Sequence, residues 1–305
     1  MTKRTIIVAA AAAVIGGFIL INLLLHFGQK RHDRLGYDIA QAFPPDKPFV
    51  PGEIFASVLA EIMEHELHSP FGWRPNDFYL WGPHVLADNN ANRQLGIIMA
   101  VRESTRVFKD HLTKIPSNEY DQNLVIADTD FRNDAERWIL PSPEGKYADG
   151  VARLRAYVAG LRATPQTSRP INLRNAELGW LLQSWTDMLG DAHANLYRTQ
   201  KDDGSAVEPW DVDDYFYHAQ GVAYVMYHLM QAVKREYALA IKNKPVLGAL
   251  VDESLTPLKQ AATLKPLVVL DGPPAGIVAN HRKNLDAFIS EARQKMFTLT
   301  DELAR

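Results

Sequence analysis

The chain has 305 residues, of which 47% are hydrophobic and 23% are charged, so it can bury a sizeable core in one or two domains. It contains no cysteine, which excludes disulfides, thiolate nucleophiles and cysteine-bound metals. Five basic residues and one acidic residue lie in 1–34, whereas the net charge of the whole chain is −3, so the remainder is acidic. An acidic domain without a basic stripe suits the phosphate backbone poorly, and we expect no nucleic-acid partner.

An apolar segment near the N-terminus predicts a transmembrane helix. Residues 5–27 contain no lysine, arginine, aspartate or glutamate. As a helix they would span about 34 Å, enough to cross a hydrocarbon core of about 30 Å. A cleaved signal peptide is the alternative, but the apolar run is longer than usual in such peptides, and no small-x-small site precedes Gln29. We therefore predict an uncleaved anchor with basic flanks over 1–34, in contact with the lipid bilayer through 5–27.

The flanking charges give only a weak indication of membrane orientation. Lys3 and Arg4 on one side nearly balance Lys30, Arg31 and Arg34 on the other, so the positive-inside rule is close to a tie. A short, charged N-terminus resists translocation. This favours a cytoplasmic N-terminus with the soluble domain outside the cytoplasm.

A proline-rich segment follows the anchor. Four prolines and one glycine lie within 38–52, which assigns 35–52 to a stiff spacer and 53–305 to a soluble domain. Beyond the spacer, apolar residues recur with the 3.6-residue period of helices. The pattern predicts helices near 53–67, 93–115 and 146–163, a partly helical stretch over 119–140, and a loop over 69–91.

Three later segments repeat an apolar residue at alternating steps of four and three. They lie near 172–199, 212–242 and 281–304, and the first carries Leu178, Leu182, Trp185, Leu189, Ala192 and Leu196. Such spacing is typical of helical bundles. The run PLVVL at 266–270 is the one plausible strand or buried extended segment. We therefore predict an all-α fold class, with an N-terminal single transmembrane helix followed by a multi-helix bundle domain.

Five segments together carry a resemblance to a known family. They are SPFGWRPND (69–77), LADNNANRQLGIIMAVRESTRVFKDHL (86–112), RWILPSPEGKYADGV (137–151), VDDYFYHAQGVAYVMYHLMQAVKREY (212–237) and LVVLDGPPAGIVANH (267–281). With the N-terminal anchor, the chain resembles the uncharacterised proteobacterial inner-membrane protein family catalogued as domain of unknown function 2333. The resemblance implies a bacterial inner-membrane protein with one span. It implies no activity, because the family has no assigned chemistry.

The first polar cluster is Glu61, Glu64, His65 and His68, which share one face of the predicted helix. Carboxylates and imidazoles on one face can ligate zinc or iron. The two histidines are three residues apart, so the H-E-x-x-H motif of metalloproteases is not present. A solvated polar face explains the same pattern.

A second cluster contains Asp187 and Asp191, with His193 nearby. Two carboxylates one turn apart repel each other on an exposed helix, so a cation or an acid–base role would account for them. Trp180 and Trp185 on the same helix indicate a core position instead.

A third cluster lies at the start of the helix near 212–242. Asp214 and His218 are one turn apart, and a carboxylate that orients an imidazole is a common part of catalytic and metal sites. No G-x-S-x-G motif accompanies them. Capping of the helix by Asp211, Asp213 and Asp214 is the structural alternative, and Gly221 within the helix indicates a close helix contact.

A fourth candidate is the loop that contains Trp73, Arg74, Asn76 and Asp77. Such a loop could line a ligand or partner site, since loops often carry function. It could equally be a connector in which Asn76 or Asp77 caps the next helix.

No catalytic or cofactor motif is present: there is no P-loop, dinucleotide fingerprint or EF-hand, and we predict no cofactor. We predict a membrane-anchored helical envelope protein that acts as a non-enzymatic scaffold or interaction module for another envelope protein. The expected location is the bacterial inner membrane, with the soluble domain in the periplasm. The alternatives are a membrane-tethered metal-assisted hydrolase that uses His65, His68 or the Asp214–His218 pair, and a bundle that binds a small molecule or lipid.

Overall fold

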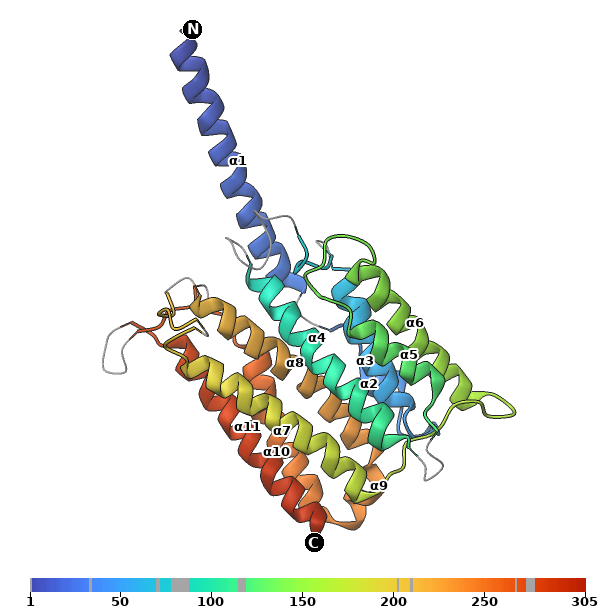
Figure 1. The fold of residues 1–305 in the computed structure, drawn as a ribbon. Coiled ribbons are helices and arrows are strands. Elements are labelled where there is room, and N and C mark those ends of the chain that lie inside the picture. Colours follow the sequence, from blue (N-terminus) through green and yellow to red (C-terminus); the bar gives the residue numbers. More distant parts are fainter. Residues whose placement is uncertain are drawn as a thin grey trace.

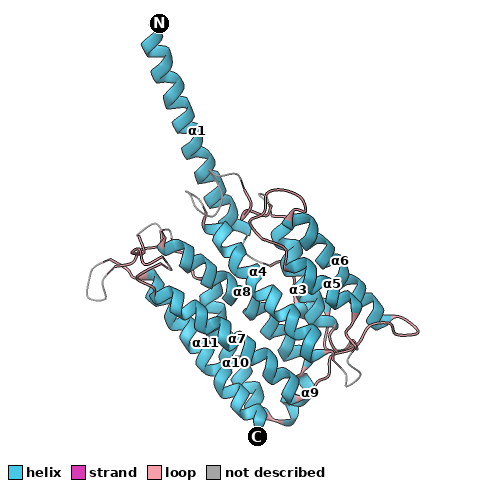
Figure 2. Ribbon diagram, in the orientation of Figure 1, coloured by secondary structure: helices cyan, strands magenta, loops and turns pink. Residues whose placement is uncertain are grey.

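The protein is all-α, as the apolar periodicity predicts. The computed structural model describes residues 2–32, 35–69, 72–77, 88–114, 119–201, 203–208, 211–266, 268–272 and 278–305. Within these ranges there is no strand, only two isolated bridges (Figure 2). The helices are α1 (Lys3–His32), α2 (Ile39–Ala42), α3 (Glu53–Leu67), α4 (Asn89–Val107), the π-helix η1 (Phe108–Leu112), α5 (Gln122–Phe131), α6 (Pro143–Arg162), α7 (Asn175–Tyr197), α8 (Val212–Glu236), α9 (Ala238–Asn243), α10 (Pro245–Thr263) and α11 (His281–Ala304).

Helix α1 projects from one end of the bundle (Figure 1). Its segment Lys3–Ile21 is long and apolar enough to cross a membrane, with a mean hydropathy of 2.2, and none of it is buried within the protein. We call the end of the bundle from which α1 projects the α1 end. The opposite end, which holds α9 and the C-terminus, is the distal end.

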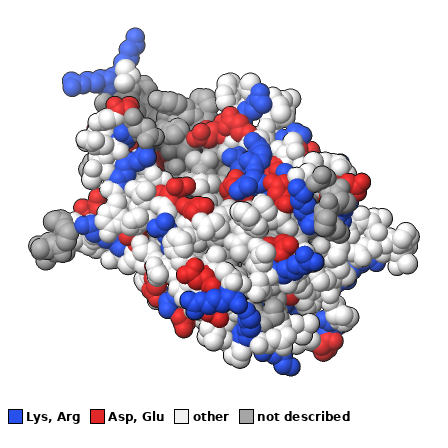
Figure 3. Space-filling view, turned by 60° about the horizontal axis from the view of Figure 1, so that its bottom comes forward, with Lys and Arg blue, Asp and Glu red and all other residues white. Residues whose placement is uncertain are grey.

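The remaining long helices run roughly along one axis in two groups that share a centre. Helices α4 and α8 pack on each other in the middle, α3, α5 and α6 lie on one side, and α7, α10 and α11 lie on the other (Figure 1). The predicted apolar seams form the core, because each seam residue of α7 and α11 is buried. In Figure 3, which brings the distal end forward, basic and acidic side chains are intermixed on the visible face.

Two glycines allow α4 and α8 to approach closely. A Cβ atom on Gly221 of α8 would lie 2.1 Å from the carbonyl oxygen of Arg93, and one on Gly96 of α4 would lie 2.0 Å from that of His218. Ordinary contacts of a Cβ start at 3.4 Å, so only glycine fits at either position. The close helix contact predicted at Gly221 is confirmed.

The start of α3 is fixed by a buried carboxylate from the end of α8. Glu236 accepts hydrogen bonds from the backbone N–H groups of Gly52 at 3.0 Å, Ile54 at 2.9 Å and Phe55 at 3.2 Å. The first N–H groups of a helix have no partner within the helix, so Glu236 satisfies them from outside. Burial raises the pKa of Glu236 to about 7, although these N–H groups favour the charged form.

The proline-rich segment packs along the bundle. Arg235 donates to the carbonyl oxygen of Pro44 at 3.1 Å and lies over the ring of Phe49 at 4.9 Å. Phe43 is buried, and Tyr37 is half-buried against the core. The chain after α1 therefore runs to the distal end before α3 begins.

Some predicted elements differ from the structure. The pattern does not predict α10, which contains Pro257 in its interior, where a proline usually interrupts a helix. The helix predicted over 212–242 ends at Glu236 and a short α9 follows. The described residues of the segment predicted at 266–270 form no strand, and it is buried only in part: Pro266 is buried and Val269 packs against the core, whereas Val268 and Leu270 are exposed.

Candidate functional site

The loop over 72–77 joins the α5–α6 connection to the bundle. Trp73 is buried, its indole N–H donates to the carbonyl oxygen of Ala135 at 2.8 Å, and its ring meets that of Tyr147 edge-on at 5.0 Å. The Asn76 amide donates to the carbonyl oxygen of Arg137 at 3.2 Å. These contacts make the loop a packed connector. Residues 70, 71 and 78–87 of the loop predicted over 69–91 lie outside the described residues.

Arg74 and Asp77 form an ion pair inside this loop. Arg74 is almost fully buried, and its backbone N–H donates to the side chain of Gln94 at 2.8 Å. Burial raises the pKa of Asp77. The next helix among the described residues is α4, which starts at Asn89 with Asp88 at its N-cap, so neither Asn76 nor Asp77 caps it.

A second buried ion pair connects α3 to α4. Glu66 accepts hydrogen bonds from Arg93 at 2.9 Å and from Gln94 at 3.2 Å, and Arg93 also lies 4.5 Å from the ring centroid of Tyr224. Both charged side chains are nearly inaccessible to solvent. This polar network links three helices near the α1 end.

Acidic residues gather where α4 and α8 begin. Asp214 accepts a hydrogen bond from Asn92 at 2.6 Å, and Asp88 and Asp213 lie close enough to repel it. Burial first, and this repulsion second, raise the pKa of Asp214 to about 9 and that of Asp88 to about 7. Asp214 therefore holds a proton at neutral pH.

The pairing of Asp214 with His218 does not form in the part of the chain that the structure describes. The hydrogen bond to Asp214 comes from Asn92 instead. Burial lowers the pKa of His218, so it is a neutral imidazole at neutral pH. Asp211, at the N-cap of α8, makes no side-chain cap and pairs with Lys201 at 2.7 Å.

The acidic and histidine residues of α3 separate into different environments. Glu61 and Glu64 both pair with Arg155 of α6, at 2.6 and 2.5 Å. His68 is exposed, with its Nδ1 2.9 Å from the carbonyl oxygen of Glu64, and His65 is half-buried. In the described ranges no group of three His, Cys, Asp or Glu side chains is arranged to hold a metal ion.

His193 is not part of the same site as Asp187 and Asp191. Its Nδ1 lies 2.6 Å from a carboxylate oxygen of Asp286 and 3.2 Å from the hydroxyl of Ser290, both on α11. The two aspartates instead project from another face of α7, beside α4.

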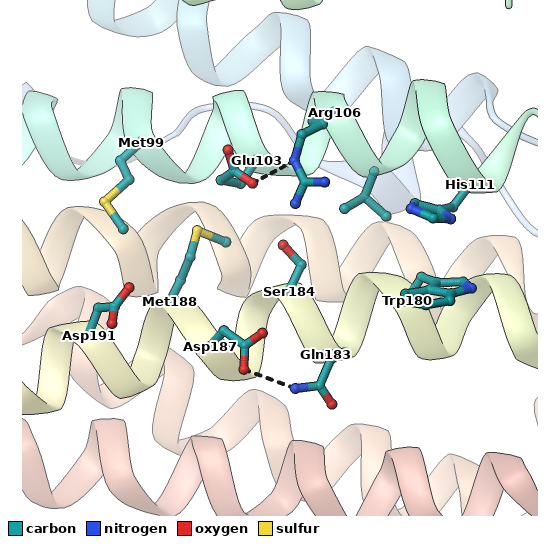
Figure 4. A pocket seen from close by; sticks show the side chains of 11 residues that line it. Met99, Glu103, Arg106, His111, Trp180, Gln183, Ser184, Asp187, Met188 and Asp191 are labelled. Atoms are coloured by element: carbon teal, nitrogen blue, oxygen red, sulfur yellow. Dashed lines mark hydrogen bonds and ion pairs between the residues drawn. The ribbon is translucent and has the colours of Figure 1, made fainter.

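A surface groove of about 490 Å³ lies between α4–η1 and α7 (Figure 4). It is lined by Met99, Glu103, Arg106, Val107, His111, Trp180, Gln183, Ser184, Asp187, Met188 and Asp191. The Trp180 ring is 56% exposed and stacks on His111 with a centroid distance of 4.7 Å and an interplanar angle of 19°. The prediction that Trp180 is a core residue is therefore wrong, whereas Trp185 is fully buried and donates to Ser104 at 2.9 Å.

The groove is acidic. Arg106 pairs with Glu103 at 2.8 Å, and the Asp187 carboxylate accepts a hydrogen bond from the amide of Gln183 at 2.9 Å (Figure 4). Asp191 lies at the far end of the groove from Trp180. Glu103 also lies 3.7 Å from Arg132, so its charge is balanced by two arginines. A basic group from outside would relieve the repulsion between the two remaining carboxylates, Asp187 and Asp191.

Comparison with family models shows which protein family the chain is related to. The model described as "uncharacterized protein conserved in bacteria (DUF2333)" matches residues 5–204 and 183–305, which together span nearly the whole chain. The chain belongs to this family. The resemblance read from the five sequence segments is thereby confirmed. Neither the comparison with curated proteins nor the one with solved structures of other proteins found a match for this DUF2333 chain.

One feature of the DUF2333 sequence could have indicated the groove. Trp180 lies two residues after Leu178, off the apolar seam of α7, so it points away from the core. The π-helix gave no comparable signal. It carries His111, and Thr113 closes it by donating through N–H and hydroxyl to the carbonyl oxygen of Phe108. Such turns are frequent at functional sites.

Proposed function

We propose that the protein is a non-enzymatic, membrane-anchored interaction module of the bacterial envelope. Its groove between α4–η1 and α7 binds a basic, apolar-faced helical segment of another envelope protein. The observation that carries this proposal is the exposed Trp180 ring in a groove with a surplus of carboxylates.

The size and chemistry of the groove support a helical occupant. From Met99 to His111 it follows about three turns of helix, or about 18 Å. Two helices that flank an apolar groove commonly bind a third through its apolar face. Tryptophan and methionine are enriched at such interfaces, and Trp180, Met99 and Met188 supply them here.

The anchor part of the proposal is supported by α1. The helix continues for 30 residues, and its apolar side chains, such as Ile7 and Val14, face outward, where lipid would cover them. Lys3 and Arg4 precede the apolar run and resist translocation, which favours an inner-membrane protein with the domain in the periplasm.

Site-specific photocrosslinking in intact membranes tests the groove. A photoreactive phenylalanine analogue at position 180 should give one crosslinked partner, and sequencing of the adduct should show a segment with lysine or arginine beside apolar residues. The matched control is position 246, because Val246 is 57% exposed and lies in α10, outside the groove.

Charge reversal supplies the second part of this experiment. Asp187→Lys with Asp191→Lys should abolish the adduct at position 180, because these carboxylates would no longer attract a basic segment. The proposal fails if no adduct forms, if position 246 captures the same protein, if the captured segment is acidic, or if charge reversal leaves the yield unchanged.

A further inference from the structure

Three consecutive apolar side chains are exposed at the tip of the α5–α6 connection. Trp138 is 82% exposed, Ile139 is 54% and Leu140 is 85%. Single exposed apolar residues are common on soluble proteins, but a contiguous group that includes tryptophan indicates a surface that contacts something else.

The base of this connection is held firmly, so the tip is presented in a defined position. Arg102 of α4 donates to the carbonyl oxygens of Phe131 and Asn133, each at 2.5 Å. The Tyr147 hydroxyl donates to the carbonyl oxygen of Asn133 at 2.9 Å, and Trp73 donates to that of Ala135. The hydrogen bonds at its base therefore hold the exposed tip in a fixed place on the domain.

The tip lies at the α1 end, level with the place where α1 meets the bundle (Figure 1). The described residues between α10 and α11 lie at the same end, and among them Val268, Leu270 and Val278 are 62%, 41% and 49% exposed. Two separate loops thus carry apolar side chains toward the side on which α1 would enter lipid.

We propose that Trp138, Ile139 and Leu140 insert into the interfacial layer of the bilayer that α1 spans, with Val268, Leu270 and Val278 as a second contact. The inference rests on the proposed anchoring by α1. Tryptophan is favoured in this layer because its ring is apolar and its N–H is polar. With α1 and two loops in lipid, the domain has a fixed tilt and does not swing freely about the end of α1.

Spin labelling tests this with the full-length chain in vesicles of phosphatidylethanolamine and phosphatidylglycerol. Because the chain has no cysteine, Leu140→Cys and Leu239→Cys each create a single labelling site. Leu239 is the matched control, since it is 77% exposed but lies in α9 at the distal end. A nitroxide at 140 should be relaxed more by oxygen than by a water-soluble nickel complex, and the order should reverse at 239.

Two further measurements distinguish failure of the loop insertion from failure of the α1 anchor. Flotation of the same vesicles after an alkaline wash reports on α1 alone. If the protein floats but position 140 behaves like 239, the loop insertion is refuted and the anchor stands, whereas loss of flotation refutes the anchor itself. Adding Trp138→Ser and Ile139→Ser to Leu140→Cys should raise the nickel accessibility at 140 several-fold, and unchanged accessibility would overturn the inference.

Discussion

The crossing of α4 and α8 predicts that Gly221→Ala destabilises the domain. Alanine in a helix interior is more favourable than glycine by about 1 kcal/mol, so without a neighbour the substitution would stabilise. Here the new Cβ would lie 2.1 Å from the carbonyl oxygen of Arg93 and 3.0 Å from the backbone nitrogen of Ile97. Both atoms belong to the backbone of α4, so the helices must separate by roughly 1 Å to restore normal contact.

Overpacking a core costs about 1–3 kcal/mol, and a conflict between two central backbones belongs at the upper end of that range. After subtraction of the helix-propensity gain, we expect Gly221→Ala to lower the free energy of unfolding by about 2 kcal/mol. The assay is urea unfolding of the detergent-solubilised chain, followed by circular dichroism, with the midpoint and slope compared between variants.

Gly179→Ala is the matched control. Gly179 also lies in a helix, but a Cβ there would meet nothing within 4 Å. It should therefore raise the free energy of unfolding by up to about 1 kcal/mol. If Gly221→Ala proves as stable as Gly179→Ala, the argument that the glycine pair sets the distance between α4 and α8 is wrong.

Three further predictions concern charge and topology. The pKa of Asp214 in the folded state is about 9, above its ordinary value of 3.8, so the stability that its proton contributes is complete below pH 4 and is lost as the pH rises through 9. Asp214→Asn should flatten the fall of the unfolding midpoint between pH 5 and 9, and an unchanged slope would contradict the burial of this carboxyl. Glu66→Gln should destabilise the domain by about 3 kcal/mol in urea unfolding, because it leaves the buried Arg93 charge without its counter-ion, and a loss below 1 kcal/mol would show that Arg93 is otherwise compensated. Alkaline phosphatase fused after Arg305 should be active in whole cells if the domain is periplasmic, whereas activity only from a cytoplasmic reporter fused there would reverse the proposed topology.

The sequence predicts the architecture well because burial of one helix face leaves a periodic trace along the chain. The seams through Leu182, Met226 and Ile289 are in the core, except for the half-buried Tyr215 at the start of the second. Helix α10 is not predicted, because Pro257 disfavours a helix in the local sequence. Packing of α10 on α8 and α11 outweighs this local preference.

The candidate site is harder to predict because its contacts join distant parts of the chain. The pattern singles out Asp187 and Asp191 by their repulsion, and both line the groove. It gives no indication of Glu66, whose partners lie 27 and 28 residues away on α4. Nor does it separate Asp214 from His218, because a spacing of one turn permits a hydrogen bond but the choice of Asn92 as donor depends on how α4 meets α8.

The hydrogen bonds that Glu236 accepts from the start of α3 also set an order of events during synthesis. The carboxylate and Gly52 are 184 residues apart, so when α3 emerges from the ribosome its first turn lacks the partner that α8 later supplies, and water must satisfy its N–H groups. If α1 spans the bilayer, as proposed, it would enter lipid well before α8 is made. Until Glu236 is made, these hydrogen bonds at the distal end cannot form, so this cap of α3 requires the final turn of α8.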